Sequence, residues 1–566
     1  MVQRNAPQQR LIQGPQCWAC RERRVRCDSE TPGCAKCAAK GIDCPGYAST
    51  RPLRWREPKV PKTFKAQKAD KAYSFPDLPL EVGFCLRTGD TIDGAIASEV
   101  AYYNDRVTPD LVVTDSSSNP FRWCLKLSAI APSYLNYAHA GISVFHRIVQ
   151  RRHTDPNGTR GASMELSALS DPEGATFYRY YASALKGVNE ELSKTTKKLN
   201  ITILAGIMML LFSQLQQAAY GHWRVHLDGL KRLLGHYGGM ERLLEQYLDT
   251  GFLVSNVLII DTMSTTTAPA KSMTADTLSW HMAYLRILPQ LDYNVIPTPT
   301  PIPPHLLKAV IMINLARATA RQAQGDEDET GPSESGFTLS RILAELDITP
   351  APDSESDILN DTDIKSIPNV NPKDEPLQPS TKESDKTLFT TAYRSAITLY
   401  AVESYLSLSM EPASLSLSLT QILDPALIPE STRAIKDAAY DALIHSIRSL
   451  FDRRDDDTTA HTNTNSHGEK GSEAPGAYWK FIFWPLAIAG VHCATESRSR
   501  EDYEYICGRL FEMTAALGTL CMRDAAVFIR RLWCECEELR GRVGGLGEGR
   551  ELSWDGIFRD APLFLL

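Results

Sequence analysis

From about residue 92 onward, the chain contains long stretches in which apolar residues recur at helical spacing. In one stretch Trp223, Leu227, Leu230 and Leu234 fall on a single face, which is the pattern of an amphipathic helix that buries that face. Few stretches alternate as strands do, so the pattern predicts an all-α body. Helices are expected over residues 145–152, 176–192, 198–217, 223–234, 305–323, 388–406, 431–453, 478–496, 503–517 and 522–539.

Two polar segments interrupt this helical pattern. Residues 325–387 are rich in Asp, Glu, Ser and Pro, and residues 455–476 are polar and low in complexity. Chains of this composition bury too little apolar surface to offset their conformational entropy. Both segments are therefore predicted to be disordered insertions in one helical domain over 85–566. The first also contains apolar islands, which are typical of activation segments, and a solvated loop is the alternative.

Charge is distributed unevenly along the chain. Residues 1–71 carry a net charge of +10, although the whole chain carries −7. A basic head on an acidic body indicates a polyanionic partner for the head. The first residues lack the apolar core of a secretory signal, and the apolar run 201–212 is about half the ~20 residues that a membrane span needs. No membrane association is expected.

The basic head contains a cysteine-dense unit over residues 17–44. A C-x2-C-x6-C motif occurs twice in this unit. In a reducing compartment, clustered cysteines favour metal binding over disulfide bonds. Each zinc takes four ligands, so two ions must share two of six sulfur atoms. The duplication makes Cys17 and Cys34 the natural bridges. The predicted ligands of two zinc ions are Cys17, Cys20, Cys27, Cys34, Cys37 and Cys44.

The segments around this unit complete the predicted domain organisation. Residues 1–16 are expected to be a disordered lead, 45–84 a basic linker and 85–566 the helical domain. The linker lacks a sustained apolar heptad, so no coiled coil is expected there. Because 28 residues cannot bury an adequate core, the metal should supply the folding energy of the cysteine unit.

Four arginines lie between the second and third cysteines, at Arg21, Arg23, Arg24 and Arg26. A guanidinium group can donate two hydrogen bonds to guanine O6 and N7, and it can also bind phosphate. Beside a turn held by metal, these side chains would form a rigid cationic surface. Double-stranded DNA is the polyanion that fits this surface.

The cysteine spacing, the basic loop, Asp28 and Pro32 resemble the Zn2Cys6 binuclear cluster of fungal transcription factors. The resemblance implies that the first helix enters the DNA major groove and reads CGG triplets. It also implies base contacts by Arg23 and Arg24, and mainly phosphate contacts by Arg21 and Arg26. This sequence departs from the family pattern at Arg24, where Lys is usual, and at Glu22, where a basic residue is common.

The body resembles the helical regulatory domain that often follows this cluster in fungal transcription factors. The resemblance rests on residues 119–122 (Asn-Pro-Phe-Arg), residues 223–229 (Trp-Arg-Val-His-Leu-Asp-Gly) and the terminal Trp554. Together the two resemblances imply a nuclear, sequence-specific transcription regulator rather than an enzyme. Its partners would be DNA and the transcription machinery or co-regulators, and a homodimer remains open because the body could dimerise.

Two other functions are compatible with parts of the sequence. The zinc module could serve protein contact without DNA, or it could be an accessory of an enzyme or metabolite-binding protein. No nucleophile–base pair, P-loop or zincin motif supports catalysis. On resemblance alone, the controlled genes are expected to be a specialised-metabolite biosynthetic cluster, with nutrient use or a stress or drug response as the alternative.

Overall fold

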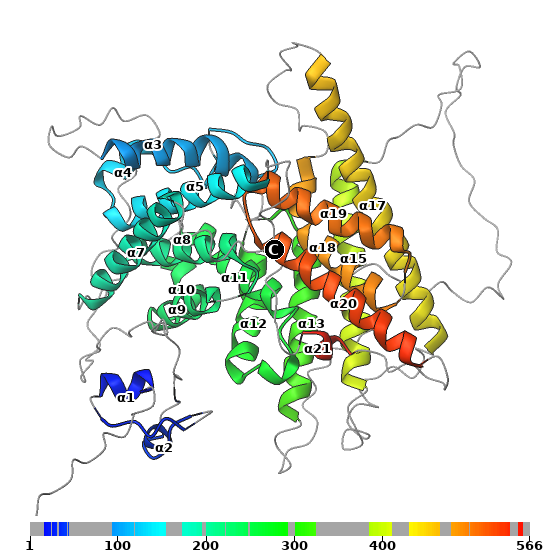
Figure 1. The fold of residues 1–566 in the computed structure, drawn as a ribbon, viewed down its shortest axis with the longest axis horizontal. Helices are drawn as coiled ribbons and strands as arrows, with labels where there is room; N and C mark the ends of the chain where they lie inside the picture. The colour runs from blue at the N-terminus through cyan, green and yellow to red at the C-terminus, as the bar shows by residue number, and fades with distance from the viewer. Residues whose placement is uncertain are drawn as a thin grey trace, which may run out of the picture. The chain divides into compact units, whose positions relative to one another are not determined.

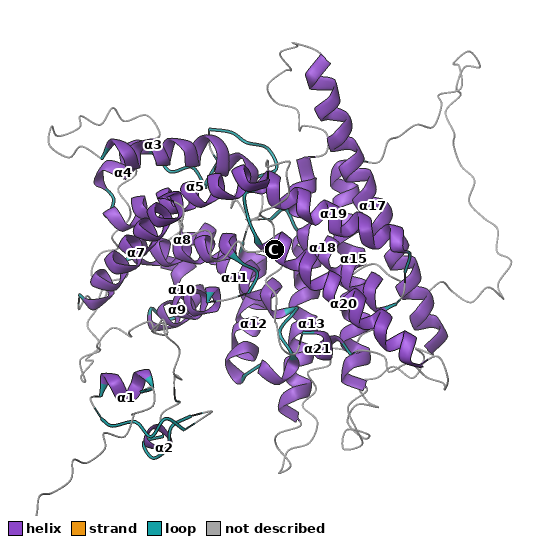
Figure 2. Cartoon of the chain, viewed as in Figure 1, coloured by secondary structure: helices purple, strands orange, loops and turns teal. Residues whose placement is uncertain are grey.

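The structure is a computed structural model, and the chain divides into two compact units, residues 1–57 and 58–566. Within the described part of the chain, every regular element is a helix (Figure 2). The residues that the structure describes are 16–23, 25–30, 33–41, 44, 93–117, 119–153, 172–194, 200–220, 222–246, 250–291, 300–323, 384–409, 429–463, 477–496, 498–543 and 553–558.

A first group of helices in the second unit packs around α5 (Figure 1). Two glycines let its neighbours approach closely: a Cβ atom on Gly187 would lie 2.7 Å from Cβ of Tyr134, and one on Gly206 would lie 2.8 Å from Cε2 of Tyr134. The group comprises α3 (Gly94–Tyr102), η1 (Tyr103–Val107), η2 (Thr108–Leu111), α4 (Leu125–Ile130), α5 (Ser133–His153), α7 (Pro172–Ser193), α8 (Ile201–Gln217), α9 (Trp223–His236) and α10 (Gly239–Gln246).

The remaining helices form a second group around α18, whose residues 483–494 are all buried. This helix contacts α15, α17, α19 and α20, so it lies at the centre of the apolar core. The group comprises α11 (Gly251–Thr265), η4 (Ala270–Ser272), α12 (Ala275–Ile287), η5 (Leu288–Gln290), α13 (Pro304–Ala323), α15 (Asp385–Ser409), α17 (Pro429–Asn463), η6 (Ala477–Phe481), α18 (Phe483–Thr495), α19 (Arg500–Leu517), α20 (Cys521–Val543) and α21 (Trp554–Ile557).

The all-α prediction is confirmed, but several helices lie outside the predicted set, and the two longest of these are α11 and α12. Helix α11 is buried on every side from Leu253 to Thr265, and a helix without an exposed face has no amphipathic period to detect. Helix α12 has only three buried residues, so its apolar stripe is weak. Both helices were missed because periodicity reports a boundary between core and solvent.

The predicted insertions differ from the structure at their edges. Helix α15 begins at Asp385 and α17 continues to Asn463, so both extend into segments that were expected to be disordered. Arg453 donates to Asp385 at 2.5 Å, and Asp455 accepts from Arg454 and Arg509. These ion pairs hold polar helix ends that composition alone would assign to a loop. Residues 324–383 and 464–476 lie outside the described residues, as do 1–15 and 45–92.

Arg317 on α13 carries a buried positive charge, with its side chain 2% exposed. Its guanidinium donates to the carbonyl oxygens of Thr265, Thr266 and Ala268 at 3.3, 3.2 and 2.6 Å. These carbonyls lie at and just beyond the end of α11, where a helix leaves its last carbonyl groups without partners and carries partial negative charge. Asp555 on α21 completes the site by accepting from Arg317 at 2.6 Å.

A chain of hydrogen bonds continues from this charge into the core. Arg317 donates to the Tyr400 hydroxyl at 2.9 Å, and Tyr400 donates to Oδ1 of Asn314 at 2.6 Å. Nδ2 of Asn314 lies 3.1 Å from Nε2 of His281, and Nδ1 of His281 lies 3.0 Å from the carbonyl oxygen of Thr277. His281 therefore fits the neutral tautomer with the proton on Nδ1. The network joins α12, α13, α15 and α21.

No helix in the described part of the chain is long and apolar enough to cross a lipid bilayer.

Replacing Asp555 by alanine is expected to lower the free energy of unfolding of the helical unit by about 3 kcal/mol, because it leaves the buried Arg317 charge without its counter-ion. Chemical denaturation followed by circular dichroism measures this loss. The control is Glu245→Ala, since Glu245 is exposed on α10 and an exposed substitution should stay within ~0.5 kcal/mol. Equal stability of the two variants would contradict the prediction.

Acid is expected to destabilise the helical unit between about pH 6.5 and 4. Burial lowers the pKa of four histidines from 6.5 to about 4: His139, His146, His226 and His281. In this window the unfolded chain takes up protons that the folded chain does not, so stability falls as pH falls. Each histidine contributes up to about 1.4 kcal/mol per pH unit, and the contribution ends below the folded pKa.

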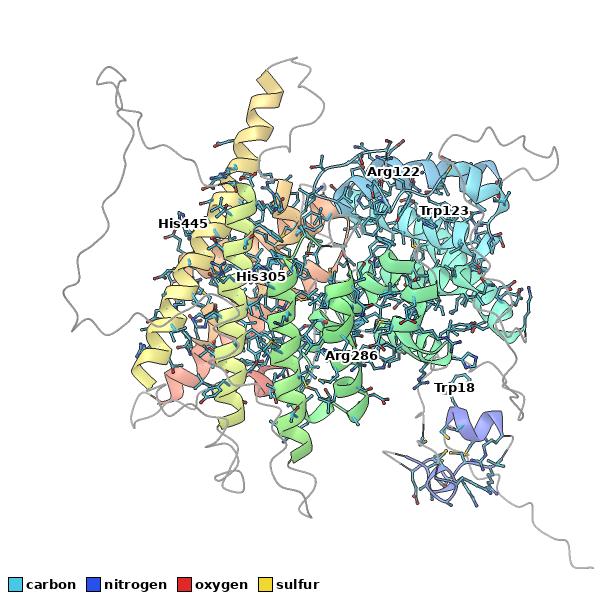
Figure 3. The ribbon with its side chains drawn as sticks, turned by 180° about the vertical axis from the view of Figure 1, so that it is seen from behind. Trp18, Arg122, Trp123, Arg286, His305 and His445 are labelled. Carbon is cyan, nitrogen blue, oxygen red and sulfur yellow. The ribbon has the colours of Figure 1, made fainter. Side chains whose placement is uncertain are left out.

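Denaturation series across this pH range measure the slope of stability against pH. His139→Gln should reduce the slope, because it removes one buried titrating group. His445→Gln is the matched control, since His445 is exposed on α17 (Figure 3). A slope that does not change in His139→Gln, or that changes equally in both variants, would contradict the assignment.

Candidate metal centre

Two short helices in the first unit present the cysteines in equivalent ways. Helix α1 (Trp18–Glu22) begins directly after Cys17, and α2 (Ala35–Ala38) begins directly after Cys34. The Cys17 sulfur accepts from the Cys20 amide at 3.4 Å, and the Cys34 sulfur accepts from the Cys37 amide at 3.3 Å. The two halves of the sequence repeat therefore fold alike. In each half, the first sulfur accepts a hydrogen bond from a backbone amide of the helix that follows it.

The four cysteine sulfurs on these helices converge on one point. The distance between the sulfur atoms is 3.6 Å for Cys17 and Cys34, 3.8 Å for Cys17 and Cys37, and 3.6 Å for Cys20 and Cys34. Four thiolates at the usual Zn–S distance of about 2.3 Å in a tetrahedron would be about 3.8 Å apart. The observed spacing fits this geometry, and Figure 3 shows the sulfur atoms gathered beside α1.

The last cysteine of each half completes the group. The thiol of Cys27 contacts that of Cys20, and the thiol of Cys44 contacts that of Cys17. Both side chains are half-buried, whereas the other four are fully buried. Cys27 also lies within 4.8 Å of Cys34, measured between their ligand atoms. All six predicted ligands are thus brought together.

The environment of the sulfurs favours a divalent cation. Burial raises the pKa of the Cys37 thiol to about 12, and burial also raises the pKa of Cys20. Without a compensating charge these thiols keep their protons. A soft divalent ion such as zinc binds the thiolate form and displaces the protons. The donor set and its spacing therefore fit zinc, which supplies the cross-links that so small a unit needs.

Asp28 holds the second helix in place. Its carboxylate accepts from the amides of Ala35 and Lys36, both at 3.2 Å, and from Glu30 at 3.3 Å. The amides of Ala35 and Lys36 belong to the first turn of α2, where a helix leaves its N–H groups without partners. The sequence marks Asp28 as part of the family pattern but does not reveal this role. The signal in the sequence that could have indicated this role is an acidic residue separated by a turn from the start of a helix.

The structure describes only part of the arginine cluster. Arg23 and Arg26 are exposed beside the cysteine group, as a surface for an external partner requires. Arg21 lies in α1, but its side chain is outside the described residues, and so is the whole of Arg24. The grouping of four arginines on one surface therefore stays a prediction.

Comparison with known families gives two matches. Residues 16–54 match the fungal Zn(2)-Cys(6) binuclear cluster domain, and residues 99–444 match the fungal specific transcription factor domain. The chain belongs to the fungal-specific transcription factor family. In the cluster domain of this family, six cysteines bind two zinc ions.

Two curated relatives are similar to this chain. The phomenoic acid biosynthesis cluster-specific transcriptional regulator of Leptosphaeria maculans is 24% identical over 532 residues, covering 91% of this chain and 85% of the relative. The aspercryptin biosynthesis cluster-specific transcription regulator of Emericella nidulans is 27% identical over 162 residues, covering 27% of this chain and 24% of the relative. No solved structure matches the chain.

Residues 119–122, one of the segments that carried the resemblance of the body, hold a loop in place within the matched domain. The side-chain nitrogen of Asn119 donates to Thr108 O at 2.9 Å, and Arg122 donates to Asn104 O at 3.0 Å. Trp123 next to them stacks on His139, with ring centroids 4.6 Å apart. Arg122 and Trp123 are labelled in Figure 3. These contacts fix the segment that leads into α4.

A second group of potential metal ligands already contains a cation. Glu403, His492 and Glu496 place their ligand atoms within 4.8 Å of one another. The Lys436 ammonium, however, contacts Glu403 at 3.0 Å and also pairs with Glu496. The buried lysine occupies the position between the two carboxylates, and the group is a charge cluster that joins α15, α17 and α18.

Replacing Asp28 by alanine is expected to lower the zinc affinity of the cluster about fivefold. The loss of a helix cap costs about 1 kcal/mol, and zinc binding and folding of such a module share one free energy. Competition with a chromophoric chelator measures the affinity. Glu30→Ala is the matched control, because Glu30 is exposed and acidic. An affinity that falls equally in both variants would contradict the capping role.

Proposed function

We propose that this chain is a nuclear transcription regulator that binds CGG-type triplets in DNA through its zinc module. The observation that supports this best is the convergence of the cysteine sulfurs, with Cys17, Cys20, Cys34 and Cys37 at distances that suit zinc. Zinc bound by these sulfurs would make the module rigid, so that its arginines form a fixed basic surface. The net charge of +10 on residues 1–71 favours a polyanion as the binding partner.

Cys17 and Cys34 are the proposed bridging ligands. One zinc ion would be bound by Cys17, Cys20, Cys27 and Cys34, and the other by Cys34, Cys37, Cys44 and Cys17. In this scheme Cys34 shares an ion with Cys20, and Cys17 shares an ion with Cys37. The distances of 3.6 and 3.8 Å between these sulfur pairs support both assignments.

The arginines would divide the contacts with DNA between bases and backbone. Arg23 and Arg24 would donate to guanine O6 and N7 in the major groove, which is the geometry in which a guanidinium distinguishes G·C from other pairs. Arg21 and Arg26 would bind phosphates and set the orientation of the module. The exposure of Arg23 and Arg26 supports their availability for these contacts.

The helical unit would act as the regulatory domain, not as an enzyme. Its proposed bounds are residues 85–566, after a lead over 1–16, the zinc module over 17–44 and a basic linker over 45–84. It would connect DNA binding to the transcription machinery or co-regulators, and it would be the element that dimerises if the regulator acts as a homodimer.

The proposed target is a specialised-metabolite biosynthetic gene cluster. The names of both curated relatives describe cluster-specific regulators, and the first of them aligns with most of this chain. The alternative is control of nutrient use or of a stress or drug response. Expression profiling of a deletion strain distinguishes the two, because loss of a cluster regulator changes the expression of contiguous genes, whereas the alternative affects genes scattered over the genome.

Selection of random DNA sequences by the full chain, with zinc and with chelator, tests DNA recognition. The expected result is zinc-dependent enrichment of CGG-containing sites, and the triplet spacing then reports whether two copies bind. The contrary result is binding that depends on salt concentration but enriches no DNA sequence. That outcome would favour a basic zinc module used for protein contact.

Arg24→Ala is expected to reduce discrimination against mismatched triplets by ~1–3 kcal/mol, because a bidentate contact with guanine is lost. Arg26→Ala is the contrasting control: it should weaken binding to all sequences alike and reduce the salt slope by about 1, as a phosphate contact does. Titration of CGG and mutated sites at several salt concentrations measures both. Unchanged specificity in Arg24→Ala would refute the assignment.

Cys34→Ala is expected to remove both zinc ions, since a bridging sulfur belongs to both coordination shells. Cys27→Ala is the matched control, because its sulfur is assigned to one ion and the other should remain. Native mass spectrometry of the purified chain counts the ions directly. Two zinc ions retained by Cys34→Ala, or equal loss from both variants, would contradict the bridging scheme.

A further inference from the structure

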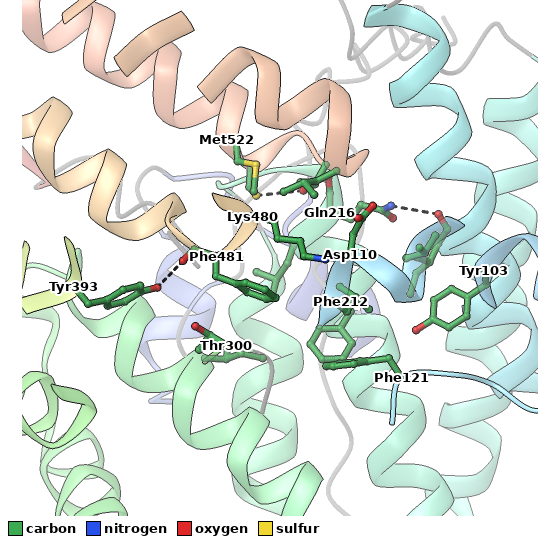
Figure 4. A pocket seen from close by; sticks show the side chains of 18 residues that line it. Tyr103, Asp110, Phe121, Phe212, Gln216, Thr300, Tyr393, Lys480, Phe481 and Met522 are labelled. Atoms are coloured by element: carbon green, nitrogen blue, oxygen red, sulfur yellow. Dashed lines mark hydrogen bonds between the residues drawn. The ribbon is translucent and has the colours of Figure 1, made fainter. Parts of the chain in front are cut away.

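The helical unit contains a cavity with a volume of about 200 Å³. Its walls come from segments far apart in the sequence: η1 and η2, α5, α8, η6 and the start of α20 (Figure 4). A molecule in the cavity would therefore touch both helix groups. Most of the wall is apolar, including Val107, Leu111, Phe121, Phe212, Phe481 and Met522.

The size and lining of the cavity restrict its occupant. An apolar cavity of about 150 Å³ in another protein is large enough for benzene, so about 200 Å³ accommodates a ring with a short substituent. Aromatic side chains on two sides, from Phe121 and Phe481, suit an apolar ring or chain. These features favour a small molecule that is mainly apolar.

One polar wall group lacks a partner. Gln216 on α8 is 9% exposed, and its Nε2 donates to Ile142 O at 3.3 Å and to Gly518 O at 3.2 Å. Because both partners are carbonyl oxygens, the amide cannot be reversed without losing these bonds. Among the residues that the structure describes, no group donates to its buried Oε1, which costs free energy unless a bound molecule supplies a donor.

Two charged residues complete the wall. Lys480 donates to Pro109 O at 2.7 Å, and its side chain extends toward Asp110 (Figure 4). Burial lowers the pKa of Lys480 and raises the pKa of Asp110 to about 6, while their mutual attraction opposes both shifts. At neutral pH the two charges cancel. The wall therefore favours an uncharged ligand, because a charged one would leave an excess charge in a desolvated site.

We propose that this cavity binds a small, uncharged, mainly apolar molecule that carries a hydroxyl group. The hydroxyl hydrogen supplies the donor that Gln216 Oε1 lacks, and the apolar remainder packs against Phe121, Phe212 and Phe481. A hydroxyl oxygen is also an acceptor for the Lys480 ammonium. Since the walls belong to both helix groups, occupancy stabilises the folded helical unit.

Binding of three probes to the full, zinc-loaded chain tests this proposal by calorimetry and thermal unfolding. The probes share a propyl-substituted ring and differ in one group: 4-propylphenol, propylbenzene and 4-propylbenzoate. The phenol should bind about tenfold more tightly than the hydrocarbon, because it satisfies the buried acceptor. The benzoate should bind most weakly, because it brings a net charge.

Two variants locate the binding site. Leu111→Trp should abolish binding of all probes by filling the cavity, and Gln216→Met should remove the preference for the phenol over the hydrocarbon. That preference is a ratio within one variant, so a loss of stability on substitution does not affect it. Lys186→Met is the control, because Lys186 is exposed on α7, and it should leave all affinities unchanged.

Several results would overturn the proposal. The first is that no probe binds the wild-type chain, and the second is that the benzoate binds most tightly. The third is undiminished binding to a Leu111→Trp variant whose circular dichroism spectrum is intact. The fourth is a preference for the phenol that persists in Gln216→Met. Because none of these measurements involves DNA, they are independent of the proposed transcriptional function.

Discussion

Arg317 places a full positive charge inside the helical unit, and several helices are positioned by the way that charge is satisfied. Its donors meet carbonyl oxygens at the end of α11, the Tyr400 hydroxyl of α15 and the Asp555 carboxylate of α21. Trp484 of α18 and Trp554 of α21 also donate to Thr266, at 3.0 and 2.8 Å. A buried charge tolerates few alternative arrangements, so these contacts specify which helix ends meet.

The two units of the chain are stabilised by different means. The helical unit buries a large apolar core around α18, and the polar groups inside it are connected in networks such as the one from Arg317 to His281. In the described part of the cysteine unit, the buried cluster consists of four cysteines and Ala19. Its fold depends on metal and on local hydrogen bonds, including those of Asp28.

The sequence was most informative where a pattern has one physical cause. The repeated cysteine spacing identified zinc as the cofactor, and amphipathic stretches such as Trp223–His236 identified helices. Periodicity could not identify α11, which has no solvent-facing side, nor the end of α17, where Asp455 is held by distant Arg509. Gln216 of the cavity could not be recognised either, because its partners Ile142 and Gly518 are far away in the sequence.

The bond between Arg317 and Asp555 spans 238 residues of sequence, and this separation affects how the protein is made. During synthesis from the N-terminus, the cysteine unit emerges before the helical unit. Its contacts are local, so it can fold around zinc without the helices that follow. The core of the helical unit stays incomplete until α21 has been translated, because until then Arg317 lacks its counter-ion. A nascent or prematurely terminated chain would therefore carry a finished metal module on an unfinished body, which cellular quality control would recognise by its exposed core.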